Sequence, residues 1–168
     1  MVIMVRKSRL LECIQLELES LLNITVSAAQ QAYETATNKQ NKAENKYDTL
    51  GLEAAYLAEG QSKRVAQYES EVEVFKKLPV KEYIEGEKIG VGALVSIVNE
   101  QEIKDILFIG PVAGGLCFSY LENGKKFDIR VVTPASPIGK ALIGLEAGDD
   151  FTLNVNGKTL THEILTVI

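Results

Sequence analysis

Residues 136–144 read Ser-Pro-Ile-Gly-Lys-Ala-Leu-Ile-Gly, and this stretch predicts a short helix in the second half of the chain. Serine is a favoured helix N-cap and proline is accepted at the first helical position, so we expect the helix to follow Ser136. Ile138, Leu142 and Leu145 then recur at the spacing of one helix face. So short an amphipathic helix buries its apolar face by packing on a sheet, and the flanking residues therefore decide the fold class.

Runs of β-branched and aromatic residues surround this helix on both sides. They are residues 92–98, 103–110, 116–121, 127–132, 151–155 and 160–168. Asn-Gly pairs at 123–124 and 156–157 are typical of two-residue hairpin turns. We therefore expect an α+β domain of five or six mostly antiparallel strands with one short helix. The strand pattern also favours a core position for Cys117, between Leu116 and Phe118.

The first half of the chain has a different composition. Residues 1–80 hold 2 of the 13 glycines and residues 81–168 hold the other 11. Glycine is costly inside helices and frequent in turns, so the two halves are different structures joined near Pro79. We expect two domains, a helical arm over residues 1–79 and the β-rich domain over residues 80–168.

Apolar residues in the arm follow a 3-4 spacing that predicts two packed helices. The first set is Leu11, Ile14, Leu18, Leu21, Thr25, Ala28 and Ala32, and the second is Ala54, Leu57, Gln61, Val65, Tyr68, Val72 and Phe75. Turn-forming residues lie between them at 47–51. An antiparallel α-helical coiled-coil hairpin therefore fits best, with small alanines toward its tip. Pairing with a second copy of the chain is the alternative, and a monomer would support the hairpin.

Composition and charge exclude several classes of protein. The formal net charge of −5 gives no basic footprint for duplex nucleic acid, so we expect no sequence-specific DNA binding. No apolar run approaches the ~18 residues of a membrane span. Cys13 and Cys117 with a single histidine, His162, predict neither a disulfide framework nor a zinc site. We expect a cytoplasmic protein without a cofactor of its own.

Residues 136–144, followed by Gly148-Asp149 and the closing strand at 163–165, resemble the C-terminal domain of the Gre family of bacterial transcription elongation factors. That family typically reads Ser-Pro-aliphatic-Ala-Arg-Ala-Leu-aliphatic-Gly and then Gly-Asp, so Gly139 and Lys140 depart from it. The resemblance implies a fold similar to the FK506-binding-protein type, preceded by an antiparallel helical arm.

The resemblance also implies a mechanism. The globular domain would dock at the rim of the secondary channel of RNA polymerase, and the loop Pro134, Ser136 and Pro137 would take part. The arm would enter the channel and bring carboxylates to the polymerase active centre and to the nascent RNA 3′ end. Two carboxylates there can share a Mg²⁺ ion with the polymerase, because Mg²⁺ prefers oxygen ligands. The chain would then assist the cleavage of backtracked RNA and not be an enzyme itself.

The expected tip of the arm departs from the family pattern Asp-x-x-Glu-Asn-x-Glu-Tyr. If Tyr56 is aligned with the final tyrosine, Thr49 stands at the Asp position and Leu52 at the first Glu position. Asp48 and Glu53 are the nearest substitutes and the predicted Mg²⁺ ligands, although residues five apart do not share a helix face. Glu44 lies four residues before Asp48, a spacing that places two side chains on the same face of a helix. Each carboxylate also has a structural explanation, as a helix cap, a first-turn acid or a solvated side chain.

Three lysines lie near the same tip, at positions 39, 42 and 46. The family resemblance implies contacts with RNA phosphates, while solvation of a helix face explains the same residues. An arm without the proper carboxylates could instead occupy the channel as an inhibitor or competitor. A coiled-coil adaptor or chaperone with a binding module similar to the FK506-binding proteins is the other alternative; prolyl isomerase activity rests on fold analogy alone.

Overall fold

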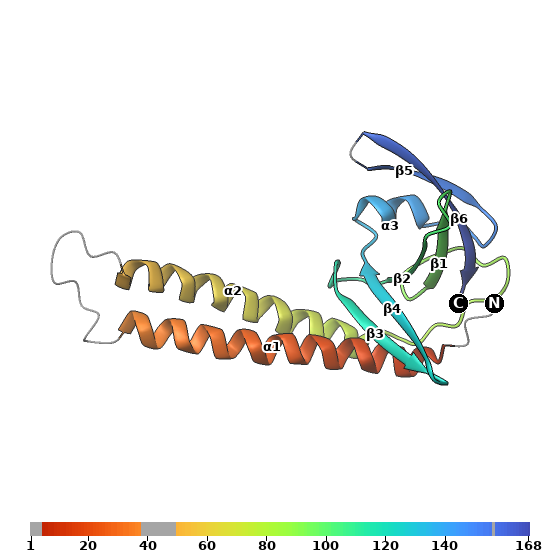
Figure 1. Cartoon of the computed structure of the whole chain (residues 1–168). Helices are drawn as coiled ribbons and strands as arrows, with labels where there is room; N and C mark the ends of the chain where they lie inside the picture. Colours follow the sequence, from red (N-terminus) through yellow and green to blue (C-terminus); the bar gives the residue numbers. More distant parts are fainter. Residues whose placement is uncertain (1–4, 38–49, 156) are drawn as a thin grey trace. The chain divides into compact units, whose positions relative to one another are not determined.

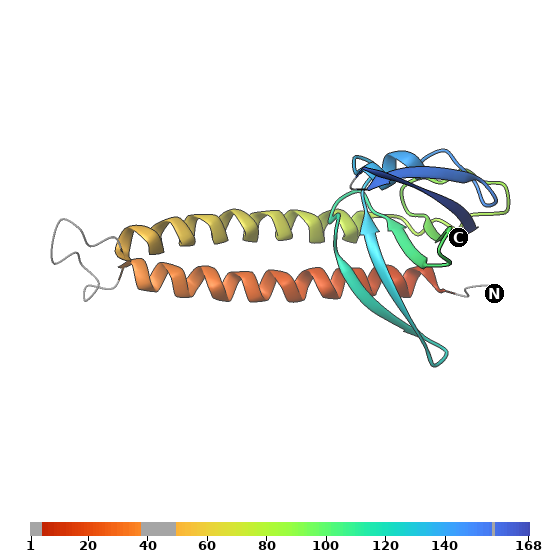
Figure 2. The same ribbon diagram turned by 45° about the horizontal axis from the view of Figure 1, so that its top comes forward.

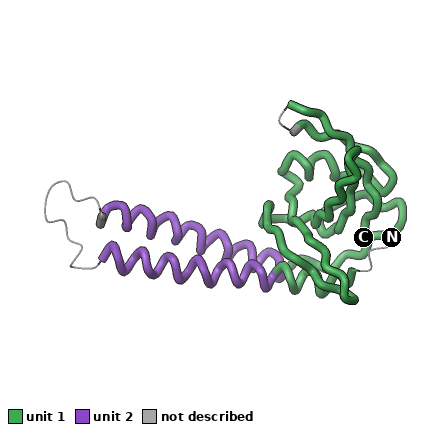
Figure 3. The backbone as a smooth tube through the Cα atoms, in the orientation of Figure 1, with its two compact units in different colours: residues 1–14, 77–168 green, residues 15–76 purple. Residues whose placement is uncertain are grey.

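The computed structural model describes residues 5–37, 50–155 and 157–168. These residues form two compact units (Figure 3). We call residues up to 14 together with 77–168 the sheet unit, and residues 15–76 the helical unit. No helix in the described ranges is long and apolar enough to span a membrane.

The helical unit consists of parts of two long helices, α1 (Lys7–Thr37) and α2 (Leu50–Lys77). They run antiparallel and side by side (Figures 1 and 2). The Gln15 side chain donates to the carbonyl of Phe75 at 3.1 Å, and Lys76 forms an ion pair with Glu19 at 3.3 Å. The predicted antiparallel pairing of two helices within one chain is therefore confirmed.

Burial within the helical unit follows most of the predicted 3-4 pattern. Leu18, Thr25 and Ala32 are buried on α1, and Ala54, Val72 and Phe75 are buried on α2. The expectation for Leu57 was wrong, because its side chain is 59% exposed. The sequence interval from Ala54 to Gln61 accommodates either Leu57 or Ala58 at a 3-4 spacing, and the half-buried residue is Ala58.

The sheet unit contains one six-stranded sheet and a short helix. The strands are β1 (Leu94–Asn99), β2 (Lys104–Ile109), β3 (Cys117–Glu122), β4 (Lys125–Val132), β5 (Asp150–Val155) and β6 (Lys158–Val167), and the helix is α3 (Pro137–Leu142). Their order in the sheet is β3-β4-β2-β1-β6-β5. The predicted α+β class is confirmed, together with the strands, the helix and the β3–β4 hairpin, in which Asn123 and Gly124 both have positive φ.

One pair of strands, β2 and β4, is parallel, so the sheet is mixed and not wholly antiparallel. This arrangement arises because β3 does not pair with β2. The chain instead places the β3–β4 hairpin beside β2 so that β4 is the inner strand and β3 the edge strand. Sequence patterns identify strands but do not identify which of two hairpin strands pairs inward.

The core of the sheet unit is formed by side chains of α3 and of the sheet that pack together. Leu142 of α3 packs with Leu107, Ile109 and Val132 from β2 and β4, and with Ile164 of β6. The predicted core position of Cys117 was wrong, because the thiol is on the exposed side of β3. Alternation along the strand buries Phe118 and Tyr120 instead.

Candidate functional site

The loop between β4 and α3 carries the three residues predicted to dock on a partner. The Ser136 hydroxyl accepts a hydrogen bond from the Gly139 amide at 3.1 Å and donates one to the Thr133 carbonyl at 2.7 Å. These bonds make Ser136 the N-cap of α3. Pro137 is exposed and Pro134 is half-buried. Ser136 therefore holds the loop in shape, while Pro137 is presented to the surroundings.

The loop differs from the family pattern at Gly139, and the close approach of the backbone there explains why this residue is glycine. A side-chain carbon at this position would overlap the carbonyl oxygen of Thr133. The alanine that is usual in the family has no space in this conformation. The first turn of α3 therefore lies unusually close to the end of β4, and the neighbouring Lys140 remains exposed.

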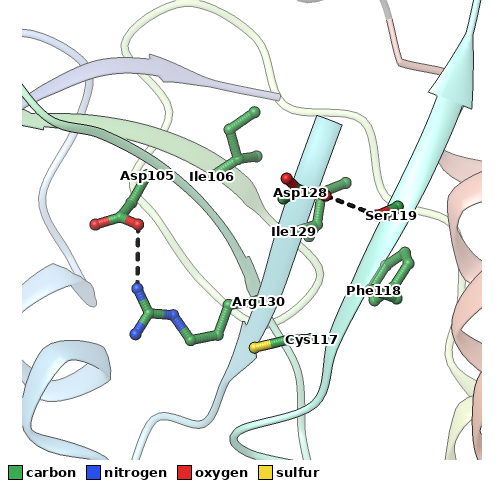
Figure 4. Close-up of a pocket in the computed structure, with 8 residues that line it drawn as sticks. All are labelled: Asp105, Ile106, Cys117, Phe118, Ser119, Asp128, Ile129 and Arg130. Atoms are coloured by element: carbon green, nitrogen blue, oxygen red, sulfur yellow. Dashed lines mark hydrogen bonds and ion pairs between the residues drawn. The ribbon is translucent and has the colours of Figure 1, made fainter. Parts of the chain in front are cut away.

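A groove of about 340 Å³ lies on the sheet unit where β2, β4 and β3 run side by side (Figure 4). Its polar side chains form two pairs, Asp105 with Arg130 at 3.1 Å and Ser119 with Asp128 at 2.6 Å. The Ser119 hydroxyl, followed by the ammonium of Lys126, lowers the pKa of the Asp128 carboxyl. Because both pairs are exposed, they add little to stability and remain available to a partner.

One wall of this groove, formed by β4, continues directly into the docking loop. Arg130 lies in β4, and the loop begins where β4 ends at Val132. The groove was not predicted from the sequence, although polar residues at alternate positions of β3 and β4 indicate a polar face of the sheet. The pairing of Asp105 with Arg130 depends on the parallel β2–β4 contact, which the sequence did not reveal. Within the described residues, no group of three His, Cys, Asp or Glu side chains could hold a metal ion.

The residues predicted for the tip of the arm are only partly described. Glu53 lies in the first turn of α2 and is exposed, where a carboxylate interacts favourably with the helix dipole. Asp48 and Glu44 lie outside the described residues, as do Lys39, Lys42 and Lys46. The distance between the two predicted Mg²⁺ ligands, Asp48 and Glu53, therefore lies outside what the described residues can show.

A buried polar network fixes the residues that precede α1 against β3 within the sheet unit. The backbone amide and the guanidinium of Arg6 donate to the Glu122 carboxylate at 3.2 and 3.1 Å, and the Tyr120 hydroxyl donates to the same group. The Tyr120 hydroxyl contributes most to lowering the pKa of Glu122, and Arg6 adds to the effect. Burial, followed by the bond to Glu122, raises the pKa of Tyr120 to about 12.

Lys7 makes a second buried connection in the sheet unit. Its ammonium donates to the carbonyls of Lys81 and Gly92 and lies 4.4 Å from the centre of the Tyr83 ring. Lys7 is 2% exposed, and burial lowers its pKa to about 8. The first turn of α1 is therefore attached to the segment that leads into β1, which explains why this turn belongs to the sheet unit.

Comparisons with known proteins agree with the sequence resemblance. Residues 121–168 match the family model of the C-terminal part of the transcription elongation factors GreA and GreB. Among curated relatives, GreA of Thermodesulfovibrio yellowstonii is 32% identical over 48% of this chain and 45% of its own length. GreA of Rhodospirillum rubrum is 24% identical over 92% of this chain and 90% of its own.

Two further similar proteins carry the name Gfh1. The transcription inhibitor protein Gfh1 of Thermus aquaticus is 32% identical over 64% of this chain and 63% of its own length. The crystal structure of the GreA factor homologue Gfh1 of Thermus thermophilus aligns with a TM-score of 0.38 at 19% identity, over 92% of this chain and 94% of that one. The match to the first curated relative spans less than half of that relative's length.

Proposed function

We propose that this chain is a Gre-family transcription elongation factor that binds RNA polymerase through the secondary channel and modulates elongation. The observation that carries this proposal is the capped loop and helix at 133–142, which lies inside the family match. The chain acts on the polymerase as an accessory factor and is not an enzyme in its own right. We propose that it does so as a monomer in the cytoplasm.

The sheet unit supplies the surface that would dock on the rim of the channel. Pro137 is exposed at the start of α3, and the Ser136 cap and the close approach at Gly139 fix its position. The groove beside the loop offers Asp105 and Arg130 in a surface ion pair. A partner can exchange such a pair for its own charges at low cost, because the pair is exposed in the free protein.

The helical unit would reach the polymerase active centre. Glu53 and Asp48 are the proposed carboxylates, with Glu44 as a further candidate, and their oxygen atoms are the ligands that Mg²⁺ prefers. A Mg²⁺ ion shared with the polymerase would stabilise the attacking and leaving oxygens during RNA cleavage. In this chain, Lys39, Lys42 and Lys46 would contact phosphates of the nascent RNA, since they follow one another at a helical spacing.

Inhibition without cleavage is a second candidate function. Thr49 and Leu52 stand at the carboxylate positions of the cleavage pattern, and one relative is named a transcription inhibitor. An arm that fills the channel without a well-spaced carboxylate pair would block access and leave the RNA uncut.

A binding assay followed by a cleavage assay separates these functions. Core RNA polymerase is first titrated with the full chain, and backtracked elongation complexes are then incubated with it. RNA shortening that disappears in Asp48→Ala and Glu53→Ala variants, with binding retained, supports the cleavage version. Binding without shortening supports the inhibitor. Absence of binding contradicts the whole proposal and favours an adaptor or chaperone.

A further inference from the structure

Gly60 lies in the interior of α2, where glycine is unfavourable. An exposed glycine inside a helix costs about 1 kcal/mol relative to alanine. Two structural reasons commonly justify such a glycine, a positive φ or a neighbour too close for a side chain. Gly60 has neither, because its φ is not positive and no atom of the described residues lies within 4 Å of the place a Cβ would occupy. The packing of this chain therefore does not require glycine here.

A shallow, open hollow of about 450 Å³ lies on the surface of α2 around Gly60. We call this hollow the Gly60 notch; its principal walls are Tyr56, Leu57, Arg64 and Gln67. Tyr56 and Leu57 are 66% and 59% exposed, so two large apolar side chains face solvent beside an open space. Residues spaced 4 and 7 apart on one helix form the kind of hole that receives a single large side chain of a facing helix.

The charge available at the notch is positive. Lys63 is engaged with Glu59 at 2.8 Å, and this ion pair raises the pKa of Lys63 and lowers that of Glu59. Arg64, on the other hand, has no ion pair or hydrogen bond within the described residues. A guanidinium is well suited to a carboxylate, which it binds through two parallel hydrogen bonds.

We propose that the Gly60 notch receives a helix of RNA polymerase that places one large apolar side chain against Gly60 and a carboxylate against Arg64. This inference rests on the proposed function and adds a specific contact surface to it. A protein helix fits better than RNA for two reasons. The notch has a single unengaged cation, whereas RNA-binding grooves neutralise several phosphates, and its apolar wall includes aliphatic Leu57, which offers no stacking surface.

The experiment titrates RNA-free core polymerase with fluorescently labelled full-length chain. Gly60→Leu fills the notch with a strong helix former, and Arg64→Gln removes the cation without altering the helix. Ala66→Leu is the matched control, because Ala66 is exposed on α2 and does not line the notch. We expect affinity to fall at least tenfold for Gly60→Leu and several-fold for Arg64→Gln, with Ala66→Leu equal to wild type.

Each outcome is decisive. Circular dichroism should show that the helices of all three variants melt at or above the wild-type temperature, so that lost affinity reports the contact. Wild-type binding that survives Gly60→Leu overturns the notch proposal and leaves the proposed function intact. Absence of wild-type binding overturns both. If affinity differs between the variants only when RNA is present in the polymerase, RNA occupies the notch and the proposed helix does not.

Discussion

In the sheet unit Tyr120, Leu107 and Ile164 are fully buried, whereas in the helical unit Tyr33, Tyr56 and Leu57 are each more than half exposed. The sheet unit buries large side chains on both sides of β2 and β4. Two helices can bury only one stripe each, so their flanks keep apolar side chains in water. This difference suggests that the sheet unit provides stability and that the flanks of the helical unit are shaped by a partner.

The largest expected effect comes from truncating one leucine in each unit. Leu107→Ala should destabilise the sheet unit by about 3 kcal/mol, because it leaves a cavity in a fully buried core. Leu57→Ala should change stability by less than about 0.5 kcal/mol, since its side chain is already exposed. Urea unfolding followed by circular dichroism measures both. Equal losses of unfolding free energy in the two variants would contradict the proposed difference in burial between the two units.

The same contrast applies to two glycines. Gly139→Ala should cost about 2 kcal/mol, because the new methyl group collides with the Thr133 backbone. Gly60→Ala should stabilise α2 by up to about 1 kcal/mol, because its surroundings are open. Thermal unfolding of the two variants checks the opposite signs. A neutral Gly139→Ala would show that α3 can move away from β4 without loss.

A third comparison concerns one carboxylate in each unit. Glu122→Gln should lower stability at pH 7, because it weakens the buried hydrogen bond from Tyr120 and the partly buried one from Arg6. Glu59→Gln, in the exposed pair with Lys63, should leave stability nearly unchanged. The pKa of Glu122 is lowered in the folded state, so its contribution is present above its usual pKa and is lost as pH falls through the folded value. Unfolding between pH 7 and 3 should show this loss in wild type and not in Glu122→Gln.

Lys7 gives the sheet unit a pH dependence of the same sign as Glu122, in a more alkaline range. Its pKa is about 8 when folded and 10.5 ordinarily, so the unfolded chain holds the proton more tightly. The contribution of Lys7 to stability should therefore rise as pH increases from 8 toward 10. Above pH 10 the raised pKa of Tyr120 acts in the opposite direction. Denaturation midpoints at pH 8 and 9.5 should move upward in wild type and stay nearly constant in Lys7→Met, and equal slopes would contradict the assignment.

The helices and strands were predicted well from the sequence, and the pairing of the strands was predicted less well. The Ser136 cap, the Asn123-Gly124 turn and the 3-4 pattern are local signals, and the structure contains all three. The parallel contact of β2 with β4 and the Asp105–Arg130 pair depend on residues far apart in sequence, which local patterns do not encode. Cys117 and Leu57 were misplaced for a related reason, since one step along a strand or helix exchanges a buried face for an exposed one.

The candidate site was predicted in the same uneven way. The Ser136 cap and Pro137 at the start of α3 were predicted because serine and proline are local structural signals, while the docking role of this loop stays a prediction. The Gly60 notch was not found, because a glycine in a helical pattern carries no indication of the side chains that surround it. The carboxylates Asp48 and Glu44 remain predictions from the sequence.

We propose that the sheet unit docks on the polymerase and that the helical unit reaches the polymerase active centre. Photocrosslinking of the complex measures this placement. A photoreactive phenylalanine derivative replaces Leu52, which is exposed in the first turn of α2. The account predicts crosslinks to polymerase segments that surround the catalytic centre, identified by mass spectrometry of the complex. Crosslinks confined to the outer surface of the polymerase, or none at all in a complex that forms, would contradict it.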